Sequence, residues 1–424
     1  MDRFVIRGGR RISGVHTPPG NKNAVLPMLA AALLTDEPLC LQNVPLIEDV
    51  HTMLAILDDL GVAVDLHGHT ATLCARRVRK RRLPPALCRK ARSTILFAGP
   101  LAARHGAATI FPPGGDIIGR RRLDTHFDGL RQLGIRVAGA DVYRFSRQNL
   151  RGAEILLDEA SVTATENIVM AAALAPGKTT LFNAACEPHV QDLCHLLCKM
   201  GAHIRGIGTN RLRIHGVERL HGARHRVAPD YIDAASFAAA AVLTGGRLIL
   251  RDAHGCPFDV LGRQLAKLGL KWSAQGGQID IPPAQTLRVR NDFGAAIPSI
   301  ADGVWPAFPS DLMSVAIVLA TQARGTVLFF EKLFESRMYF VDRLIEMGAR
   351  IVQCDPHRVI VSGPSRLHGT HLAGPDIRAG MALILAALCA KGESVIDNAA
   401  LIDRGYEHVD RELRRLGADI ERLK

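Results

Sequence analysis

The sequence predicts an α/β protein of two domains, each built from three copies of one repeated unit of about 70 residues. Three observations support this fold class. The chain has 424 residues, which is more than one hydrophobic core usually supports. A short pattern, L-x-x-[LM]-G-x-x-[VIW], occurs six times along the chain. Strand-like apolar runs lie between its copies.

The repeated pattern is typical of a helix end that leads directly into a strand. Its copies are "LDDLGVAV", "LRQLGIRV", "LCKMGAHI", "LAKLGLKW", "LIEMGARI" and "LRRLGADI". In each copy the glycine suits the left-handed position that follows an amphipathic helix, and a strand is expected to start at once. These glycines are Gly61, Gly134, Gly201, Gly269, Gly348 and Gly417.

The runs "KTTLFNAA", "GGRLILRDA" and "GTVLFFEKLF" add further strands, so each unit should hold several strands and about two helices. Three of the six glycines precede residue 228 and three follow it, which places a domain break near "HRVAPDYID". A second break fits the proline-rich stretch "TPPGNKNAV". We therefore predict a first domain at residues 22–228, carrying the loop around residue 116. The second domain would be formed by residues 1–21 together with 229–424.

The composition favours a cytoplasmic globular protein. Hydrophobic residues make up 48% of the chain and charged residues 22%. The start of the chain lacks the apolar core of a signal peptide. The longest apolar run, "MALILAALCA", is about half as long as a membrane-spanning helix. Nine cysteines without a CxxC pair indicate reduced thiols.

A formal charge of +12 favours an anionic partner. Aromatic residues are only 5% of the chain, and no helix-turn-helix, zinc-finger or RNP pattern is present, so a nucleic acid is not the expected partner. A non-catalytic basic protein that binds nucleic acid stays an alternative. Cys194 and Cys198 share a helical face beside His195, but without a second ligand pair they predict a core helix rather than a metal site.

Five local sequences carry a resemblance to a known family. They are "PGNKNAVLP", "ARSTILFAGPLAARHG", "PPGGDIIGRRRLDTH", "FPSDLMS" and "IDRGYE". In this order and spacing, and together with the six repeats, the chain resembles the enolpyruvyl transferases over essentially its whole length. It is similar to the branch that has aspartate in place of a loop cysteine. The resemblance implies two three-fold inverse α/β barrels, with helices inside and sheets outside.

The resemblance also implies a reaction. The enolpyruvyl group of phosphoenolpyruvate would pass to the 3'-hydroxyl of UDP-N-acetylglucosamine through a tetrahedral intermediate, by addition and elimination, with release of phosphate. This is the first committed step of peptidoglycan synthesis, and so it serves cell-wall biogenesis, cell shape and cell division. No metal and no organic cofactor is expected. Another acceptor, such as shikimate 3-phosphate or a nucleotide, stays open.

Phosphoenolpyruvate carries a phosphate and a carboxylate, so its site must offer several fixed cations. The resemblance implies that Lys22, Arg121 and Arg404 hold the phosphate and that Arg378 holds the carboxylate. A guanidinium group suits both anions because it can bind them through two parallel hydrogen bonds. Asn23 matches the family's amide contact to the intermediate.

Two carboxylates complete the expected catalytic set with Lys22 and Arg404. The acceptor hydroxyl must lose a proton, and Asp311 in "FPSDLMS" matches the family's candidate base. Ser310 and Asp311 also form a helix-capping signature. Asp116 stands where most relatives have the loop cysteine, and the resemblance implies that it exchanges a proton at the methylene carbon. A carboxyl is a poor nucleophile towards the epoxide fosfomycin, so we expect insensitivity to this antibiotic.

The resemblance marks a further set of positions for the sugar nucleotide. They are Arg92, Arg121, Leu123, Asp124, Ser161, Val162, Thr163, Asp311 and Leu333. Three residues depart from the family's usual choice: Arg122 replaces proline, Glu159 replaces lysine and Tyr231 replaces arginine. Asp403 and Tyr406 are expected to orient Arg404.

Overall fold

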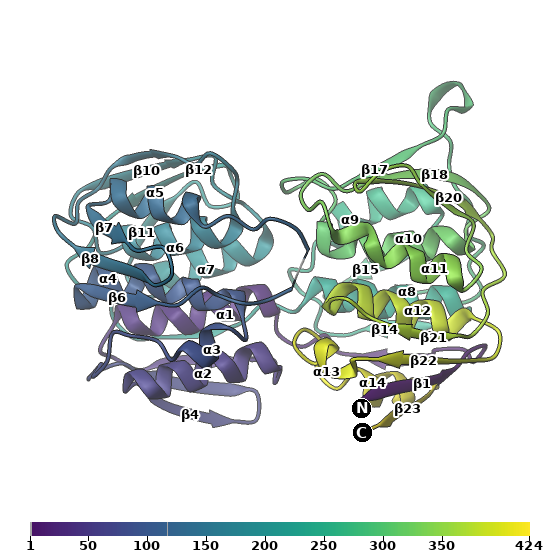
Figure 1. Cartoon of the computed structure of the whole chain (residues 1–424), viewed down its shortest axis with the longest axis horizontal. Coiled ribbons are helices and arrows are strands. Elements are labelled where there is room, and N and C mark those ends of the chain that lie inside the picture. The colour runs from purple at the N-terminus through teal and green to yellow at the C-terminus, as the bar shows by residue number, and fades with distance from the viewer. Residues whose placement is uncertain (1, 117) are drawn as a thin grey trace. The chain divides into compact units, whose positions relative to one another are not determined.

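A computed structural model describes residues 2–116 and 118–424 (Figure 1). Internal contacts divide the chain into two compact units. The N-terminal unit comprises Gly20–Gly115 and Arg122–Ala228, and the C-terminal unit comprises Met1–Pro19, Asp116–Arg121 and Pro229–Lys424. The loop segment Asp116–Arg121, which we assigned to the first domain, therefore groups with the C-terminal unit.

The described strands of the N-terminal unit form three sheets, with the orders β13-β3-β5-β4, β6-β8-β7 and β11-β12-β10-β9. The strands are β3 (Leu39–Gln42), β4 (Ala63–His67), β5 (Thr70–Cys74), β6 (Ala107–Ile110), β7 (Ile135–Ala138), β8 (Tyr143–Arg147), β9 (Glu154–Leu156), β10 (Lys178–Phe182), β11 (His203–Arg205), β12 (Arg211–His215) and β13 (Ala223–Arg226). The helices are α1 (Lys22–Ala31), α2 (Glu48–Leu60), α3 (Pro85–Cys88), α4 (Ala98–His105), α5 (Asp124–Gln132), α6 (Val162–Ala172) and α7 (Pro188–Lys199).

The described strands of the C-terminal unit form three further sheets, with the orders β15-β16-β14-β2, β17-β18-β20-β19 and β21-β22-β1-β23. The strands are β1 (Arg3–Arg7), β2 (Gly14–His16), β14 (Leu248–Leu250), β15 (Ser273–Gln275), β16 (Gln278–Ile281), β17 (Ser299–Ala301), β18 (Gly325–Phe330), β19 (Ile351–Gln353), β20 (Arg358–Gly363), β21 (His371–Ala373), β22 (Glu393–Asp397) and β23 (Asp419–Leu423). The helices are α8 (Tyr231–Thr244), α9 (Phe258–Leu265), α10 (Met313–Gln322), α11 (Val341–Glu346), α12 (Ile377–Cys389), α13 (Ala399–Ile402) and α14 (Val409–Arg415).

Five of the six described sheets share one topology, whereas β6-β8-β7 has three strands. In three of them a strand pairs in parallel with the strand beyond the next helix: β9 with β10, β17 with β18 and β21 with β22. Two antiparallel strands complete each sheet, as in the order β17-β18-β20-β19. The first strands of the chain complete sheets of the C-terminal unit: β1 pairs with β22 and β23, and β2 pairs with β14.

The predicted junction glycines are confirmed. Each lies after a helix with φ between 86° and 108°, in the left-handed region that glycine adopts most easily. One repeat departs from the expected immediate strand start, because β15 begins at Ser273, four residues after Gly269. The backbone of Lys271 there bonds the side chain of Gln285 at both its N–H and its carbonyl, instead of a partner strand.

The first helix of each repeat (α1, α4, α6, α8, α10 and α12, here called the inner helices) is buried on most sides. Strands such as β12 and β20 bury alternate residues and expose the others. In Figure 1, α10, α12 and α8 lie between the sheet with β18 and β20 and the sheet with β22 and β1. Helices thus form the core of each unit and separate small sheets cover it, although the described strands do not close into one barrel.

Within the described part of the chain, no helix is both long and apolar enough to cross a membrane.

Candidate active site

Most predicted site residues lie where an inner helix begins. Lys22 and Asn23 open α1, and Val162 and Thr163 open α6 behind the cap residue Ser161. Further positions follow the same rule: Arg92 opens the 3-10 helix Arg92–Phe97 before α4, Asp311 lies in the 3-10 helix Ser310–Leu312 before α10, and Arg378 is the second residue of α12. The unpaired N–H groups and the dipole at a helix start attract anions, so this arrangement suits phosphate and carboxylate ligands.

Asp311 is held by two arginines of the C-terminal unit. The Nη2 atom of Arg337 donates to one carboxylate oxygen at 3.0 Å, and the Nη2 atom of Arg378 donates to the other at 2.8 Å. Both guanidinium groups are buried, whereas the Asp311 side chain is 26% exposed. The carboxylate is therefore fixed in orientation yet still reachable by a ligand.

The structure contradicts the capping role that the sequence predicted for Ser310 and Asp311. Neither the 3-10 helix Ser310–Leu312 nor α10 receives a side-chain cap, and Pro309 holds the cap position of the former. The physical reason is competition, since Ser310 donates its hydroxyl to Glu331 and Asp311 binds the two arginines.

Arg378 has hydrogen-bonding capacity left over. Burial acts to lower the pKa of this guanidinium, but Asp311 and Tyr406 raise it above its ordinary value, so the group is charged. The central guanidinium carbon, Cζ of Arg378, lies 5.4 Å from the ring centre of Tyr406. Its Nη1 atom is buried and has no hydrogen-bond partner among the described residues. Such a donor is costly to leave unpaired, which makes it a candidate contact for a ligand carboxylate.

The loop residue Asp116 pairs with Arg404. The Nη1 atom of Arg404 donates to Oδ1 of Asp116 at 2.5 Å, and both side chains are less than 20% exposed. The loop is fastened nearby, because the backbone N–H of Arg120 donates to Glu335 at 2.9 Å and Ser336 N–H donates to the carbonyl of Ile118 at 3.2 Å.

Arg121, on the same loop, is half-buried. Burial lowers its pKa; Asp116 and Asp311 act in the opposite direction, while Arg337 and Arg404 lower it further. Four guanidinium groups thus lie around two carboxylates: Arg121, Arg337, Arg378 and Arg404 around Asp116 and Asp311. This cluster, which we call the arginine cluster, has a charge that suits a small, strongly anionic ligand.

In the N-terminal unit, Lys22 is buried and its ammonium lies 2.8 Å from Oδ2 of Asp49. Asn21 caps α1 by accepting from the backbone N–H of Ala24. Asn23, next in the chain, is half-buried. The burial of Lys22 requires a carboxylate partner, because an unpaired ammonium would be expensive to remove from water.

The positions predicted for the sugar nucleotide lie in two groups. In the N-terminal unit, Nη2 of Arg92 donates to the carbonyl of Arg122 at 3.1 Å.

Thr163 shares a hydrogen bond of 3.1 Å with His126. Burial lowers the pKa of His126 to about 3, so its ring is neutral at pH 7. Leu123 is buried beside Asp124, the first residue of α5. Leu333 belongs to the C-terminal unit and is 45% exposed.

Comparison with known proteins identifies the family. The family profile of EPSP synthase (3-phosphoshikimate 1-carboxyvinyltransferase) matches residues 6–413. The chain belongs to this family. It is 50% identical over 422 residues to UDP-N-acetylglucosamine 1-carboxyvinyltransferase of Treponema denticola, with 99% of both chains covered.

The corresponding protein of Bradyrhizobium diazoefficiens is 49% identical over 422 residues, covering 99% of this chain and 98% of the relative. Among solved structures, the enolpyruvyl transferase NikO from Streptomyces tendae matches with a TM-score of 0.89 at 24% identity, covering 100% of this chain and 99% of that one. The enolpyruvyl transferase fold predicted from the sequence is confirmed.

Several side chains of this EPSP synthase family member differ from what the sequence predicted. Asp403 forms ion pairs with Arg422, at 2.6 Å for the closest atoms, and Tyr406 lies under Arg378 while its hydroxyl lies 3.0 Å from Ser236. We expected both to orient Arg404. The structure links them to other arginines, because the segment after α13 packs its aromatic ring into the core.

The three departures from the usual family residues have distinct surroundings. Arg122 pairs with Asp124 at 2.9 Å and with Asp158 at 3.1 Å. Tyr231 is buried at the start of α8, with its ring centre 6.4 Å from that of Trp305. Glu159 is exposed.

Sequence reasoning missed the partners of the predicted residues. Arg337 binds Asp311, Asp49 binds Lys22 and Glu335 fastens the loop. No short-range spacing connects these partners to the motifs. The one usable signal is the charged pair of Glu335 and Arg337 within the otherwise uncharged stretch "LFESRMYF".

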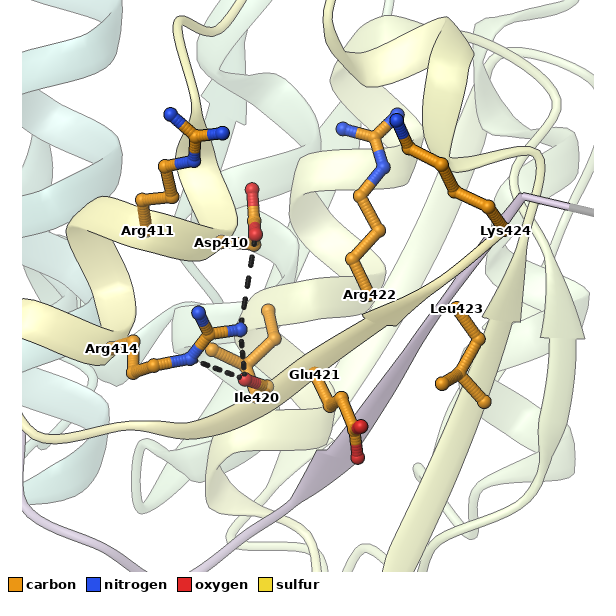
Figure 2. A pocket seen from close by; sticks show the side chains of 8 residues that line it. All are labelled: Asp410, Arg411, Arg414, Ile420, Glu421, Arg422, Leu423 and Lys424. Carbon is orange, nitrogen blue, oxygen red and sulfur yellow. Dashed lines mark hydrogen bonds and ion pairs between the residues drawn. The ribbon is translucent and has the colours of Figure 1, made fainter.

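Other groups that could have formed a site do not join it. Burial raises the pKa of the Cys194 thiol well above its usual range, and no group of three or more His, Cys, Asp or Glu side chains in the described ranges could hold a metal ion. A pocket of about 810 Å³ lies beside α14 and β23, and Figure 2 shows the side chains that line it. It contains none of the predicted site residues and is lined by Asp410, Arg411, Arg414, Ile420, Glu421, Arg422, Leu423 and Lys424.

Proposed function

We propose that this protein is a transferase that moves the enolpyruvyl group of phosphoenolpyruvate to the 3'-hydroxyl of UDP-N-acetylglucosamine and releases phosphate. The arginine cluster carries the proposal, because it joins strong cations to two carboxylates at one place. The names of the full-length relatives at about half identity support the choice of acceptor.

Phosphoenolpyruvate would be held by its two anionic groups. Arg121 and Arg404 would bind the phosphate together with Lys22, and the unpaired Nη1 of Arg378 would bind the carboxylate. Asn23 would contact the tetrahedral intermediate. Guanidinium groups fixed before the ligand arrives stabilise charge without reorganising during the reaction.

Asp311 would act as the general base. Its two oxygens accept hydrogen bonds from Arg337 and Arg378, which fix the orientation of the carboxylate, and its side chain is 26% exposed, so a ligand can reach it. As the hydroxyl oxygen bonds to the substituted carbon of phosphoenolpyruvate, the hydroxyl proton would pass to Asp311 and a proton would add to the methylene carbon. Loss of phosphate and of one methyl proton would then restore the double bond in the product.

Asp116 would supply the proton to the methylene carbon. Its ion pair with Arg404 has a consequence for this role, because Arg404 is also proposed to bind the phosphate. The incoming phosphate would compete with Asp116 for one guanidinium group.

We propose that the sugar nucleotide contacts Arg92, Arg121, Leu123, Asp124, Ser161, Val162, Thr163, Asp311 and Leu333. The backbone N–H groups at the start of α6 offer donors to a diphosphate, and Ser161 occupies one of them by accepting from Ala164. Arg122 is already neutralised by Asp124 and Asp158, so we expect it to affect acceptor choice little.

The reaction would be the first committed step of peptidoglycan synthesis in the cytoplasm, and loss of the protein would impair cell-wall growth and division. Because Asp116 replaces a nucleophilic thiol, fosfomycin would not inactivate the enzyme. A covalent fosfomycin adduct on Asp116, detected by intact-protein mass measurement, would overturn this expectation.

The first test mixes purified protein with phosphoenolpyruvate and UDP-N-acetylglucosamine and measures phosphate release, with the acceptor omitted as the control. We expect release that depends on the acceptor and a product heavier than the acceptor by the enolpyruvyl group. Absence of release would reject this acceptor, and shikimate 3-phosphate and free nucleotides would be tried next.

A further inference from the structure

Two buried acids lie directly behind the candidate base. Asp302 follows the last residue of β17 and Glu331 follows the last residue of β18. These strands run parallel, with Ala301 opposite Phe330, so the register brings the next residue of each strand side by side. The exposed fractions are 1% for Asp302 and 0% for Glu331.

Burial favours the protonated form of Glu331. Two adjacent carboxyl groups removed from water cannot both be ionised, and burial together with Asp302 raises the pKa of Glu331 to about 9. The backbone N–H of Lys332 donates to Oδ1 of Asp302, whereas Oδ2 has no partner among the described residues unless its neighbour carries a proton. Glu331 therefore holds its proton at neutral pH, and its oxygens can still accept hydrogen bonds.

Ser310 connects this pair to the candidate base. Its hydroxyl oxygen lies 2.8 Å and 2.9 Å from the two carboxyl oxygens of Glu331. The carbonyl of Ser310 accepts a hydrogen bond of 3.3 Å from Nη1 of Arg337, the arginine whose Nη2 holds Asp311. Glu331 thus fixes the residue that precedes Asp311 and the carbonyl that aims Arg337 at Asp311.

Helix capping does not explain the Ser310 hydroxyl. A serine before a helix usually caps it, but no side-chain cap is present at the helix that starts here. Burying an acid pair is also an expensive way to stabilise a turn, because a well-packed apolar pair would serve as well. A buried acid pair is justified where Asp311, the residue after Ser310, must be held in one orientation.

We propose that Glu331, acting through Ser310 and Arg337, is a positioning residue that sets the orientation of Asp311 for proton removal. The inference rests on the proposed function and adds Glu331 to the residues already assigned to the reaction. Misplacement of a catalytic group by about 1 Å can cost about 100-fold in rate. Loss of Glu331 should therefore slow turnover while both substrates still bind.

The test compares Glu331→Gln with Asp302→Asn. Both changes keep the size of one member of the same buried pair, but only Glu331 contacts Ser310. Glutamine replaces one of the two carboxyl oxygens beside the Ser310 hydroxyl with an amide nitrogen, which cannot accept a hydrogen bond. We expect Glu331→Gln to lower kcat by about 10-fold to 100-fold and to change both KM values less than about threefold. Asp302→Asn should stay within about threefold of the parent kcat, because its side-chain oxygen can still accept from Lys332.

An equal loss of kcat in the two variants would overturn the proposal, because it would show only that the buried acid pair stabilises the protein. Wild-type kcat in Glu331→Gln would also overturn it. Inactive wild-type protein would instead reject the proposed function, so the two failures are distinguishable.

A second pair of variants covers the case that Glu331→Gln does not fold. Ser310→Ala removes the hydroxyl and should lower kcat as Glu331→Gln does, while Ser310→Thr keeps a hydroxyl and should restore at least half of the parent rate. Calorimetric binding of UDP-N-acetylglucosamine should be unchanged in both. A threonine variant as slow as the alanine variant would show that packing, rather than the hydrogen bond to Glu331, governs the rate.

Discussion

The inner helices of the two units begin with different chemistry. In the N-terminal unit, α1 and α6 are capped by the neutral side chains of Asn21 and Ser161. In the C-terminal unit, α8 and α12 are capped by the carboxylates of Asp230 and Asp376, and Asp311 precedes α10. The same repeated fold therefore leaves the positive helix ends of α1 and α6 without a negative charge, whereas α8 and α12 begin beside a carboxylate.

The difference explains where the arginines lie. A neutral cap leaves the positive end of the helix available to an anion such as a diphosphate. A carboxylate cap cancels that attraction, so an anion bound near the C-terminal helices needs arginines. Arg337 opens the 3-10 helix Arg337–Phe340, Arg378 is the second residue of α12, and both bind Asp311. We propose that the two arginines also serve an anionic ligand.

The largest effect on activity is expected from Asp311→Asn. This change replaces the carboxylate before α10 with a neutral amide, like the one that Asn21 places before α1. The amide cannot take a proton, so acceptor-dependent phosphate release should fall by about 10² to 10⁴-fold. Binding of UDP-N-acetylglucosamine, measured by calorimetry, should remain detectable.

The matched control for that change is Asp376→Asn, which neutralises a buried acid at the start of the next inner helix. Asparagine caps helices as well as aspartate does, so this variant should lose much less activity. Turnover at the wild-type rate in Asp311→Asn would remove Asp311 from the base role.

The second effect concerns Arg404→Ala. A charge-assisted hydrogen bond contributes about 1.5–3 kcal/mol, so the KM for phosphoenolpyruvate should rise by about 10-fold to 100-fold. The KM for the sugar nucleotide should change far less, and steady-state kinetics with each substrate varied in turn measures both. Equal weakening of the two substrates would show that Arg404 is not specific to the phosphate.

A smaller effect is expected from Asp116→Asn, which removes the charge that occupies Arg404. Inorganic phosphate should then bind the free protein more tightly by a few-fold, as followed by calorimetry, because it no longer competes with a carboxylate. Unchanged phosphate affinity would mean that Asp116 and phosphate do not share the guanidinium group.

Asp116→Cys restores the residue that most relatives have in this loop. It should keep activity and introduce fosfomycin sensitivity, seen as time-dependent inactivation with a covalent adduct. The parent protein is the control. An active variant that is still insensitive would show that the loop as a whole, rather than this side chain, governs the drug.

The smallest effect is expected from Ser161→Ala in the N-terminal unit. Loss of a serine cap costs about 1 kcal/mol, which should appear as a slightly lower melting temperature and a modest weakening of UDP-N-acetylglucosamine binding. A large loss of phosphoenolpyruvate affinity in this variant would contradict the division of labour between the two kinds of helix start.

The sequence by itself determined the repeated architecture. A glycine that must adopt positive φ leaves a strong local mark, so the amino-acid pattern alone is enough to recognise all six helix–glycine junctions. The motifs that contain Lys22, Arg378 and Arg404 could likewise be found, because each lies within a short segment of fixed spacing.

Only the tertiary structure decided how those residues are paired. Asp311 lies 26 residues before Arg337 and 67 before Arg378, and Asp116 lies 288 residues from Arg404, so no local pattern reports these contacts. The acid pair of Asp302 and Glu331 depends on the register of two parallel strands. Hydrogen bonds act over about 3 Å in space whatever the separation along the chain, and folding alone brings these groups that close.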